Sequence, residues 1–176
     1  ETLSKQSTVL NAMAQALESE DPARALGFSK RALAIDFEEE NARAARVRLT
    51  VLAALADRLG DLEATERLST FMLNLGEAIG QKEGIFVSLF FLFAFASKCG
   101  DVSRANALWA RLDPMGRDWS RNNYQGGGLE RVRAEDLFYR GELADADIAT
   151  AETLCFDATN RYSLCKCLSL RGEWHL

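Results

Sequence analysis

The residue types that carry most enzyme chemistry are sparse in this chain. The single histidine, His175, lies one residue from the C-terminal end, which leaves almost no donors for histidine catalysis or histidine-rich zinc sites. Carboxylates are plentiful, but no pair stands in an apolar stretch that would shift a pKa towards acid–base work. Cys155 and Cys165 have no histidine nearby in the sequence, although folding could bring His175 close. We therefore expect no enzymatic activity, no metal site and no cofactor.

The four cysteines form no recognisable chemical motif. Their number would allow two disulfides, but the spacing of Cys99, Cys155, Cys165 and Cys167 matches neither a zinc knuckle nor a C-x-x-C redox pair. Nothing at the start of the chain has the layout of a signal peptide. We expect reduced cysteines that act as small hydrophobic residues in a cytoplasmic protein.

The segment from Asp113 to Gly128 is the longest predicted loop, because it holds Pro114, Gly116 and a run of three glycines. A glycine run before a helix can bind an anion, but no Lys-Ser/Thr pair follows this one, so we interpret it as a flexible connection. The aromatic and cationic residues of the loop could stack on a sugar, hold an anion, or pack onto the rest of the fold. These loop candidates are Arg117, Trp119, Arg121 and Tyr124.

The composition is that of a folded, acidic chain. Of its 176 residues, 48% are hydrophobic and 27% are charged, which differs from the low-hydrophobicity signature of disorder. The net charge of −5 argues against a nucleic-acid-coating surface. The most apolar segment, Ile85–Ala96, is too short to span a bilayer and predicts a buried helix. We expect no direct contact with nucleic acid or membrane from these residues.

A repeat of about forty residues organises the chain. Its acidic corner residues are Asp21, Asp61, Asp101 and Glu142, and a small residue follows each at Ala25, Thr65, Ala105 and Ala146. Glycine precedes the last three corner residues and can end a helix in the left-handed conformation, while the acidic residue can cap the next helix. The small residue would let that helix approach its partner closely. Each unit is thus predicted to be an antiparallel helical hairpin that buries its apolar faces by stacking on its neighbours.

The repeat predicts first and second helices in turn. First helices span about Leu3–Glu18, Asn41–Leu59, Lys82–Cys99, Gly127–Arg140 and Asn160–Arg171, and second helices about Pro22–Ile35, Leu62–Ile79, Val102–Leu112 and Leu143–Ala158. A fifth corner is predicted at Gly172, and the chain begins with Glu1 instead of methionine. We expect one all-α domain over residues 1–176, an α-α superhelix of about four hairpins plus a partial fifth, taken from a longer protein.

The corners and alanine spacings resemble the tetratricopeptide repeat. The match is clearest in the first unit, at Asp21, Ala25, Ala32-Leu33 and Ile35-Asp36. The forty-residue interval exceeds the usual 34, and segments such as Leu75–Gly84 resemble the repeats of MalT-like, LuxR-type bacterial regulators. This resemblance implies a sensing region that binds a small inducer or a regulatory protein, between an ATPase region and a helix-turn-helix. Neither of those regions has its motif in these residues.

First helices line the inner groove of such an array. Carrying the groove positions over by their offset from each corner gives a mixed polar and aromatic set, suited to a peptide or a sugar-like ligand. The set is Thr50, Asp57, Arg58, Ser97, Lys98, Arg131, Glu135, Tyr139, Tyr162 and Lys166. The alternative is a solvated face with no ligand. Phe90 shares this register, and we assign it to the core.

These observations predict a non-catalytic sensor or interaction domain of a MalT-like, LuxR-type transcriptional regulator. Its partner would be a protein, a peptide or a small-molecule inducer. The alternative is a stand-alone tetratricopeptide scaffold that mediates protein–protein interaction. A C-terminal helix with an exposed face could also pair with a second copy and give a homodimer.

Overall fold

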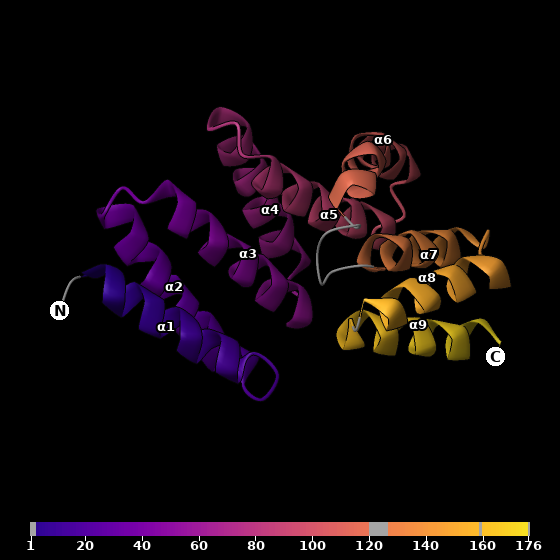
Figure 1. Cartoon of the computed structure of the whole chain (residues 1–176), viewed down its shortest axis with the longest axis horizontal. Coiled ribbons are helices and arrows are strands. Elements are labelled where there is room, and N and C mark those ends of the chain that lie inside the picture. The colour runs from indigo at the N-terminus through magenta and orange to yellow at the C-terminus, as the bar shows by residue number, and fades with distance from the viewer. Residues whose placement is uncertain (1–2, 120–126, 159, 176) are drawn as a thin grey trace. The chain divides into compact units, whose positions relative to one another are not determined.

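The computed structural model describes residues 3–119, 127–158 and 160–175, and every regular element in these ranges is an α-helix. The helices are α1 (Leu3–Leu17), α2 (Pro22–Glu38), α3 (Ala42–Arg58), α4 (Leu62–Ala78), α5 (Lys82–Lys98), α6 (Val102–Trp119), α7 (Gly128–Arg140), α8 (Asp145–Asp157) and α9 (Arg161–Trp174) (Figure 1). Within α1 to α4 and within α7 to α9, helices that follow one another pack together. The predicted all-α class is confirmed.

A step of twenty residues underlies the forty-residue repeat. Helices α2 to α6 begin at residues 22, 42, 62, 82 and 102, and the first four of them are each 17 residues long. One position in the last turn or so of each helix is buried in all five, and it carries a small residue in four of them. Its occupants are Asp36, Ala56, Gly76, Ala96 and Gly116. Small side chains there allow neighbouring backbones to approach closely, as Gly76 shows, where an added Cβ would lie 3.1 Å from the Ile85 nitrogen.

One residue at each tight corner ends one helix and starts the next. The Asp61 N–H donates to the Ala56 carbonyl (2.9 Å), which closes α3, and its Oδ1 accepts from the Ala64 N–H (3.0 Å), which caps α4. Gly60 between them has φ +74°, a left-handed conformation that glycine adopts readily. Asp21 and Asp101 cap α2 and α6 in the same way. The predicted capping role of these three aspartates is confirmed.

Glu40 occupies the position that glycine holds at the corners after α3, α4 and α5. Its φ is +53°, and the left-handed conformation costs a residue with a Cβ about 1–2 kcal/mol. Replacing Glu40 with glycine would remove this cost, but part of the gain in stability is lost because glycine makes the unfolded chain more flexible. We expect Glu40→Gly to raise the free energy of unfolding by about 0.5–1 kcal/mol, measured by urea unfolding. Glu39→Gly, one residue earlier at an ordinary φ of −86°, should not stabilise. A Glu40→Gly protein less stable than the parent would contradict this reading of the corner.

The fourth corner differs from its prediction. Helix α8 begins at Asp145, so Glu142 is not its cap, and Ala146 is exposed instead of close to a partner helix. The reason lies in the three residues between Gly141 and the helix, where the corners at Gly60 and Gly100 have one; of these three, Leu143 turns inward and is 4% exposed. The start of α8 is instead fixed by Asp147, whose Oδ2 accepts from the Ala144 N–H (3.0 Å).

Two other predicted breaks are wrong. Helix α6 continues through Pro114 to Trp119, so no loop begins at Asp113. Gly116 occupies the buried position of the twenty-residue step and Leu112 is buried one turn earlier, and their packing outweighs the helix-breaking tendency of proline. Helix α9 likewise runs through Gly172 to Trp174, so the fifth corner is absent. Glycine permits a helix end without requiring one, and Gly172 does not have a positive φ.

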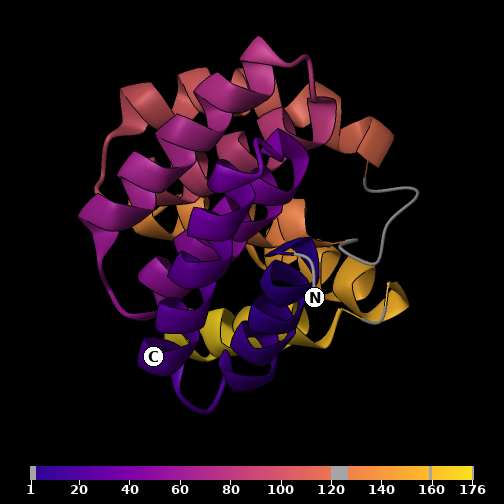
Figure 2. The same cartoon turned by 90° about the vertical axis from the view of Figure 1, so that its left-hand side faces the viewer.

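The chain divides into two compact units, residues 1–92 and 93–176, with α5 contributing to both. In unit 1, Ala14, Ala25 and Leu55 form one core cluster, and Leu49 and Met72 belong to another. Figure 2 shows the backbone of the helices that carry them, in indigo to magenta. In unit 2, one cluster is formed by Ala134, Leu143, Ile148 and Leu170, and a second by Ala151, Cys155 and Cys167. The prediction of a single domain over residues 1–176 stays a prediction.

Each unit contains a buried aspartate held by serine and arginine. In unit 1, the Ser7 hydroxyl donates to Asp36 Oδ1 (2.6 Å), and Arg48 Nε lies 3.2 Å from Asp36 Oδ2, so three successive helices meet at one carboxylate. In unit 2, Asp136 of α7 is 1% exposed and accepts from Ser97 of α5 at 2.8 Å. Buried carboxylates are stable only when they are paired and hydrogen-bonded, so both clusters fix the register of their helices.

Candidate binding surface

Three of the predicted groove residues lie along one side of α7. Arg131, Glu135 and Tyr139 are spaced four residues apart, so they follow one another on the helix surface. Arg131 pairs with Glu135, and both side chains are largely buried, whereas Tyr139 is 53% exposed. Lys166 is exposed on α9, which lies beside α7. We call Arg131, Glu135, Tyr139 and Lys166 the α7–α9 face. It offers both signs of charge and an aromatic ring.

The start of α7 is positioned by close packing against α8. Gly127 has φ +77°, and a Cβ added to it would lie 2.4 Å from the Cys155 nitrogen and 2.5 Å from the Cys155 sulfur. Gly128 is buried as well. These two glycines are therefore a close contact between helices and not the flexible connection predicted from the sequence; Gly126 lies outside the described residues. The other end of α7 is closed by Gly141, at φ +71°.

The groove residues near the end of α5 have different environments. Ser97 is 5% exposed, and its one hydroxyl proton is shared between two acceptors, Asp136 Oδ1 (2.8 Å) and the Phe93 carbonyl (3.0 Å). Its part in the structure is therefore to bind the buried carboxylate. Lys98 is exposed. The side chain of Tyr162, which the sequence places on the same side as Lys166, lies outside the described residues.

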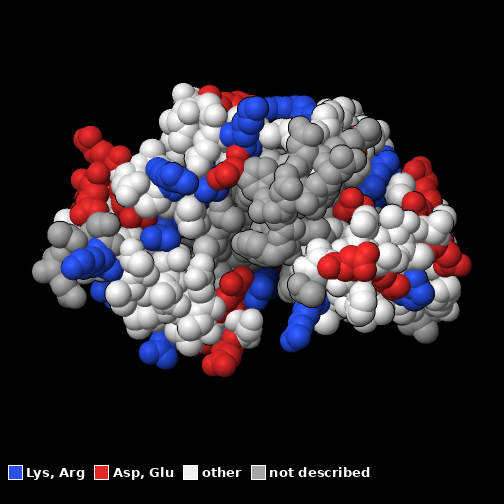
Figure 3. Space-filling model, viewed as in Figure 1, with Lys and Arg blue, Asp and Glu red and all other residues white. Residues whose placement is uncertain are grey.

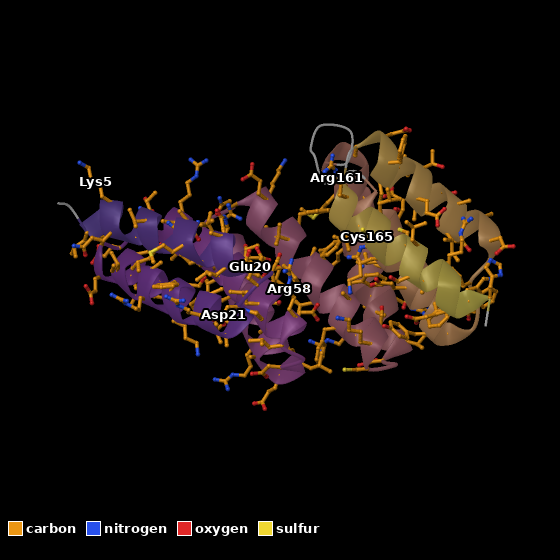
Figure 4. All side chains as sticks on the ribbon, turned by 90° about the horizontal axis from the view of Figure 1, so that it is seen from below. Lys5, Glu20, Asp21, Arg58, Arg161 and Cys165 are labelled. Atoms are coloured by element: carbon orange, nitrogen blue, oxygen red, sulfur yellow. The ribbon has the colours of Figure 1, made fainter. Side chains whose placement is uncertain are left out.

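The remaining groove residues belong to unit 1. Thr50 is partly buried and donates to the Arg46 carbonyl (3.2 Å), and Asp57 is also partly buried. Arg58 pairs with Glu18 (3.1 Å) and donates to its carbonyl (3.3 Å), which ties α3 to the end of α1. Figure 4 labels Arg58 close to the α1–α2 corner, and Arg161 and Cys165 on α9. Phe90, assigned to the core, is partly buried.

The loop candidates are only partly described. Arg117 and Trp119 lie in the last turn of α6, but their side chains are outside the description. Arg121 and Tyr124 lie wholly outside the described residues. Their proposed roles in stacking on a sugar or holding an anion stay predictions.

The structure separates the four thiols into two classes. Cys99 and Cys165 are exposed, whereas Cys155 and Cys167 are buried against each other between α8 and α9, and all four are free. Burial raises the pKa of both buried thiols, that of Cys167 to about 12. His175 lies 3.7 Å from Asp145, at the exposed start of α8. Among the described residues, no group of three or more His, Cys, Asp and Glu side chains is placed to hold a metal ion.

Thiol labelling should distinguish the two exposed cysteines from the two buried ones. A raised pKa keeps a thiol protonated at neutral pH, and only the thiolate reacts quickly. We expect a maleimide reagent at pH 7.5 to label Cys99 and Cys165 rapidly and the other two only after unfolding, as read by mass spectrometry of the intact chain. Rapid labelling of four thiols in the native protein would contradict this expectation.

The raised pKa values of Cys155 and Cys167 also lower the free energy of unfolding in alkali. The unfolded chain releases these protons above about pH 8.5, while the native pair holds them to a higher pH.

The sequence pattern did not single out two exposed aromatic residues. Phe37 of α2 and Phe71 of α4 are 49% and 47% exposed, and their rings meet edge to face with centroids 6.3 Å apart. Only Phe37 carried a sequence signal, because it interrupts a polar stretch between Asp36 and Glu38, whereas Phe71 begins the apolar run Phe71-Met72-Leu73.

No helix in the described ranges is long and apolar enough to cross a membrane. No family model, curated protein or solved structure matches the chain. The resemblance to tetratricopeptide and MalT-like repeats therefore stays a prediction.

Proposed function

We propose that the chain is a non-catalytic binding module whose first helices hold a peptide segment of a protein partner. The observation that carries the proposal is the α7–α9 face, where α7 carries the exposed Tyr139 and the Arg131–Glu135 pair and the adjacent helix α9 carries the exposed Lys166. An exposed aromatic ring on a fixed helix loses little conformational entropy on binding and provides a large contact area. Lys166 on the adjacent helix α9 would orient a polar or acidic ligand group.

The resemblance to MalT-like repeats supports a more specific proposal. In it, the module is the sensing region of a cytoplasmic, LuxR-type transcriptional regulator, and the ligand is a regulatory protein or a small inducer. The gene decides this directly, since the proposal requires a helix-turn-helix region in the codons that follow Leu176. A stop codon soon after Leu176 with no DNA-binding region would favour the alternative, a stand-alone scaffold for protein–protein interaction.

Selection from a displayed peptide library tests the binding role. Selected peptides should lose affinity by about tenfold or more when Tyr139→Ala or Lys166→Glu is introduced, because both side chains are exposed. Phe156→Ala is a matched control, since Phe156 is an aromatic residue 70% exposed on α8 in the same unit. Binding that survives both face variants and is lost in the control would overturn the proposal. If no peptide is selected but a small molecule raises the melting temperature in the parent and not in Tyr139→Ala, the ligand is an inducer.

A further inference from the structure

A second exposed surface lies in unit 1, on second helices of the hairpins instead of first helices. Phe37 and Phe71 join the second helices α2 and α4 by an edge-to-face contact, yet each ring remains about half exposed. A single exposed apolar residue needs no explanation, but two aromatic rings in contact, shared by two helices, form a fixed apolar patch. Their geometry is that of a preformed anchor site for a side chain from another molecule.

The patch is bordered by concentrated negative charge. Glu38, Glu39 and Glu40 follow Phe37 directly, and all three are exposed. Figure 3 shows acidic side chains gathered at the edge of the molecule where α2 ends and α3 begins, as located in Figure 1. At the corresponding corner after α3 the residues are Arg58, Leu59 and Gly60. Glu38 and Glu39 stand at the C-terminal end of α2, where negative charge is unfavourable, and all three glutamates directly precede Asn41, the N-cap of α3, where negative charge is favourable.

The charge selects the class of partner. Nucleic acids and anionic membranes carry the same sign as the glutamates and would be repelled. A second copy of this chain is also disfavoured, because its net charge is −5. A protein segment that presents apolar side chains together with lysine or arginine matches both parts of the surface, and its cations can also lie over the exposed faces of the rings.

We propose that Phe37, Phe71 and Glu38–Glu40 form a docking surface for a basic, amphipathic helical segment of a partner protein. The apolar side of that segment covers the two rings, and its basic side faces the three carboxylates. This surface is separate in residues from the α7–α9 face, so either one can fail without the other.

The probe is a synthetic amphipathic helix of about 18 residues, or five turns, made of leucine and lysine, with a leucine–glutamate helix as its charge-reversed counterpart. Fluorescence anisotropy with the full chain should show binding of the lysine peptide that weakens steeply with salt, and none of the glutamate peptide. Phe37→Ala with Phe71→Ala should weaken binding by about tenfold or more. Glu38→Gln with Glu39→Gln and Glu40→Gln should weaken it at low salt and remove most of the salt dependence.

Controls separate this surface from the rest of the molecule. Phe156→Ala removes a more exposed phenylalanine elsewhere, and Tyr139→Ala alters the α7–α9 face; both should leave the affinity within about twofold of the parent. The glutamine variant changes only exposed residues, so it reports on the proposal even if the double alanine variant folds poorly. Equal binding of both peptides, or unchanged binding in the aromatic and glutamine variants, would overturn the proposal. So would sedimentation showing that the patch joins two copies of the chain.

Discussion

Replacing Asp136 with alanine is expected to lower the free energy of unfolding by about 3–5 kcal/mol. Asp136 is 1% exposed and accepts from the Ser97 hydroxyl at 2.8 Å and from Arg140 Nε at 3.0 Å, while Arg133 lies on its other oxygen. Removing the carboxylate takes away one of the two acceptors of the buried Ser97 hydroxyl and leaves two guanidinium groups without their counter-charge. The penalty comes from those remaining groups, because a buried pair contributes less when intact than its breaking costs.

Two further variants serve as an intermediate case and as a control for Asp136→Ala. Asp136→Asn keeps the side-chain volume and the acceptor for Ser97 but removes the charge, so it should fall between alanine and the parent. Asp157→Ala, at an exposed position in the same unit, should change stability by less than about 0.5 kcal/mol. Urea unfolding followed by circular dichroism measures all three. If Asp136→Ala costs no more than Asp157→Ala, the buried carboxylate does not hold α5 to α7.

The second large effect is expected from Gly127→Ala. At φ +77° a Cβ costs about 1–2 kcal/mol by itself, and here it would also lie 2.4 Å from the Cys155 nitrogen. Because backbone atoms of α8 cannot move aside cheaply, overpacking adds about 1–3 kcal/mol, and we expect a total loss near 3 kcal/mol. Gly141→Ala is the matched control, since its φ is +71° but no atom lies within 4 Å of the added Cβ. It should cost only about 1 kcal/mol, because alanine also restricts the unfolded chain.

The comparison of these two glycines also tests whether packing against α8 fixes the position of α7, which carries part of the α7–α9 face. Gly127 fixes where α7 begins against α8, so a displaced α7 would move Tyr139 relative to Lys166. Thermal or urea unfolding of the two alanine variants should separate them by about 2 kcal/mol. Equal losses would mean that the clash at Cys155 relaxes without cost and that α7 is not held rigidly at its start.

Most of the helical layout followed from local chemistry visible in the sequence. Asp21, Asp61 and Asp101 cap helices through their own side chains, and glycine before two of them closes the preceding helix, so residue type and position together fix these corners. Pro114 and Gly172 failed as signals for the opposite reason. Each is compatible with more than one backbone state, and tertiary packing decides between them.

The surface could be predicted less well than the fold. Spacing placed Arg131, Glu135 and Tyr139 on one side of a helix correctly, because helix periodicity alone determines that. It could not show that Ser97 would be buried against Asp136, since that contact joins residues 39 positions apart on two helices. The exposed pair of Phe37 and Phe71 was missed because their contact also joins two helices far apart in the sequence. In addition, a phenylalanine on a helix is normally assigned to the core.

Hydrogen–deuterium exchange with and without a peptide selected for binding tests the central claim most directly, because it locates the ligand on the chain. The proposal that first helices of unit 2 form the binding surface predicts that the ligand slows exchange in residues 128–140 and 161–174, while α2 and α4 remain unchanged. Slowed exchange confined to α2 and α4, or to α8 alone, would contradict it. So would an unchanged exchange pattern at a ligand concentration that saturates the chain.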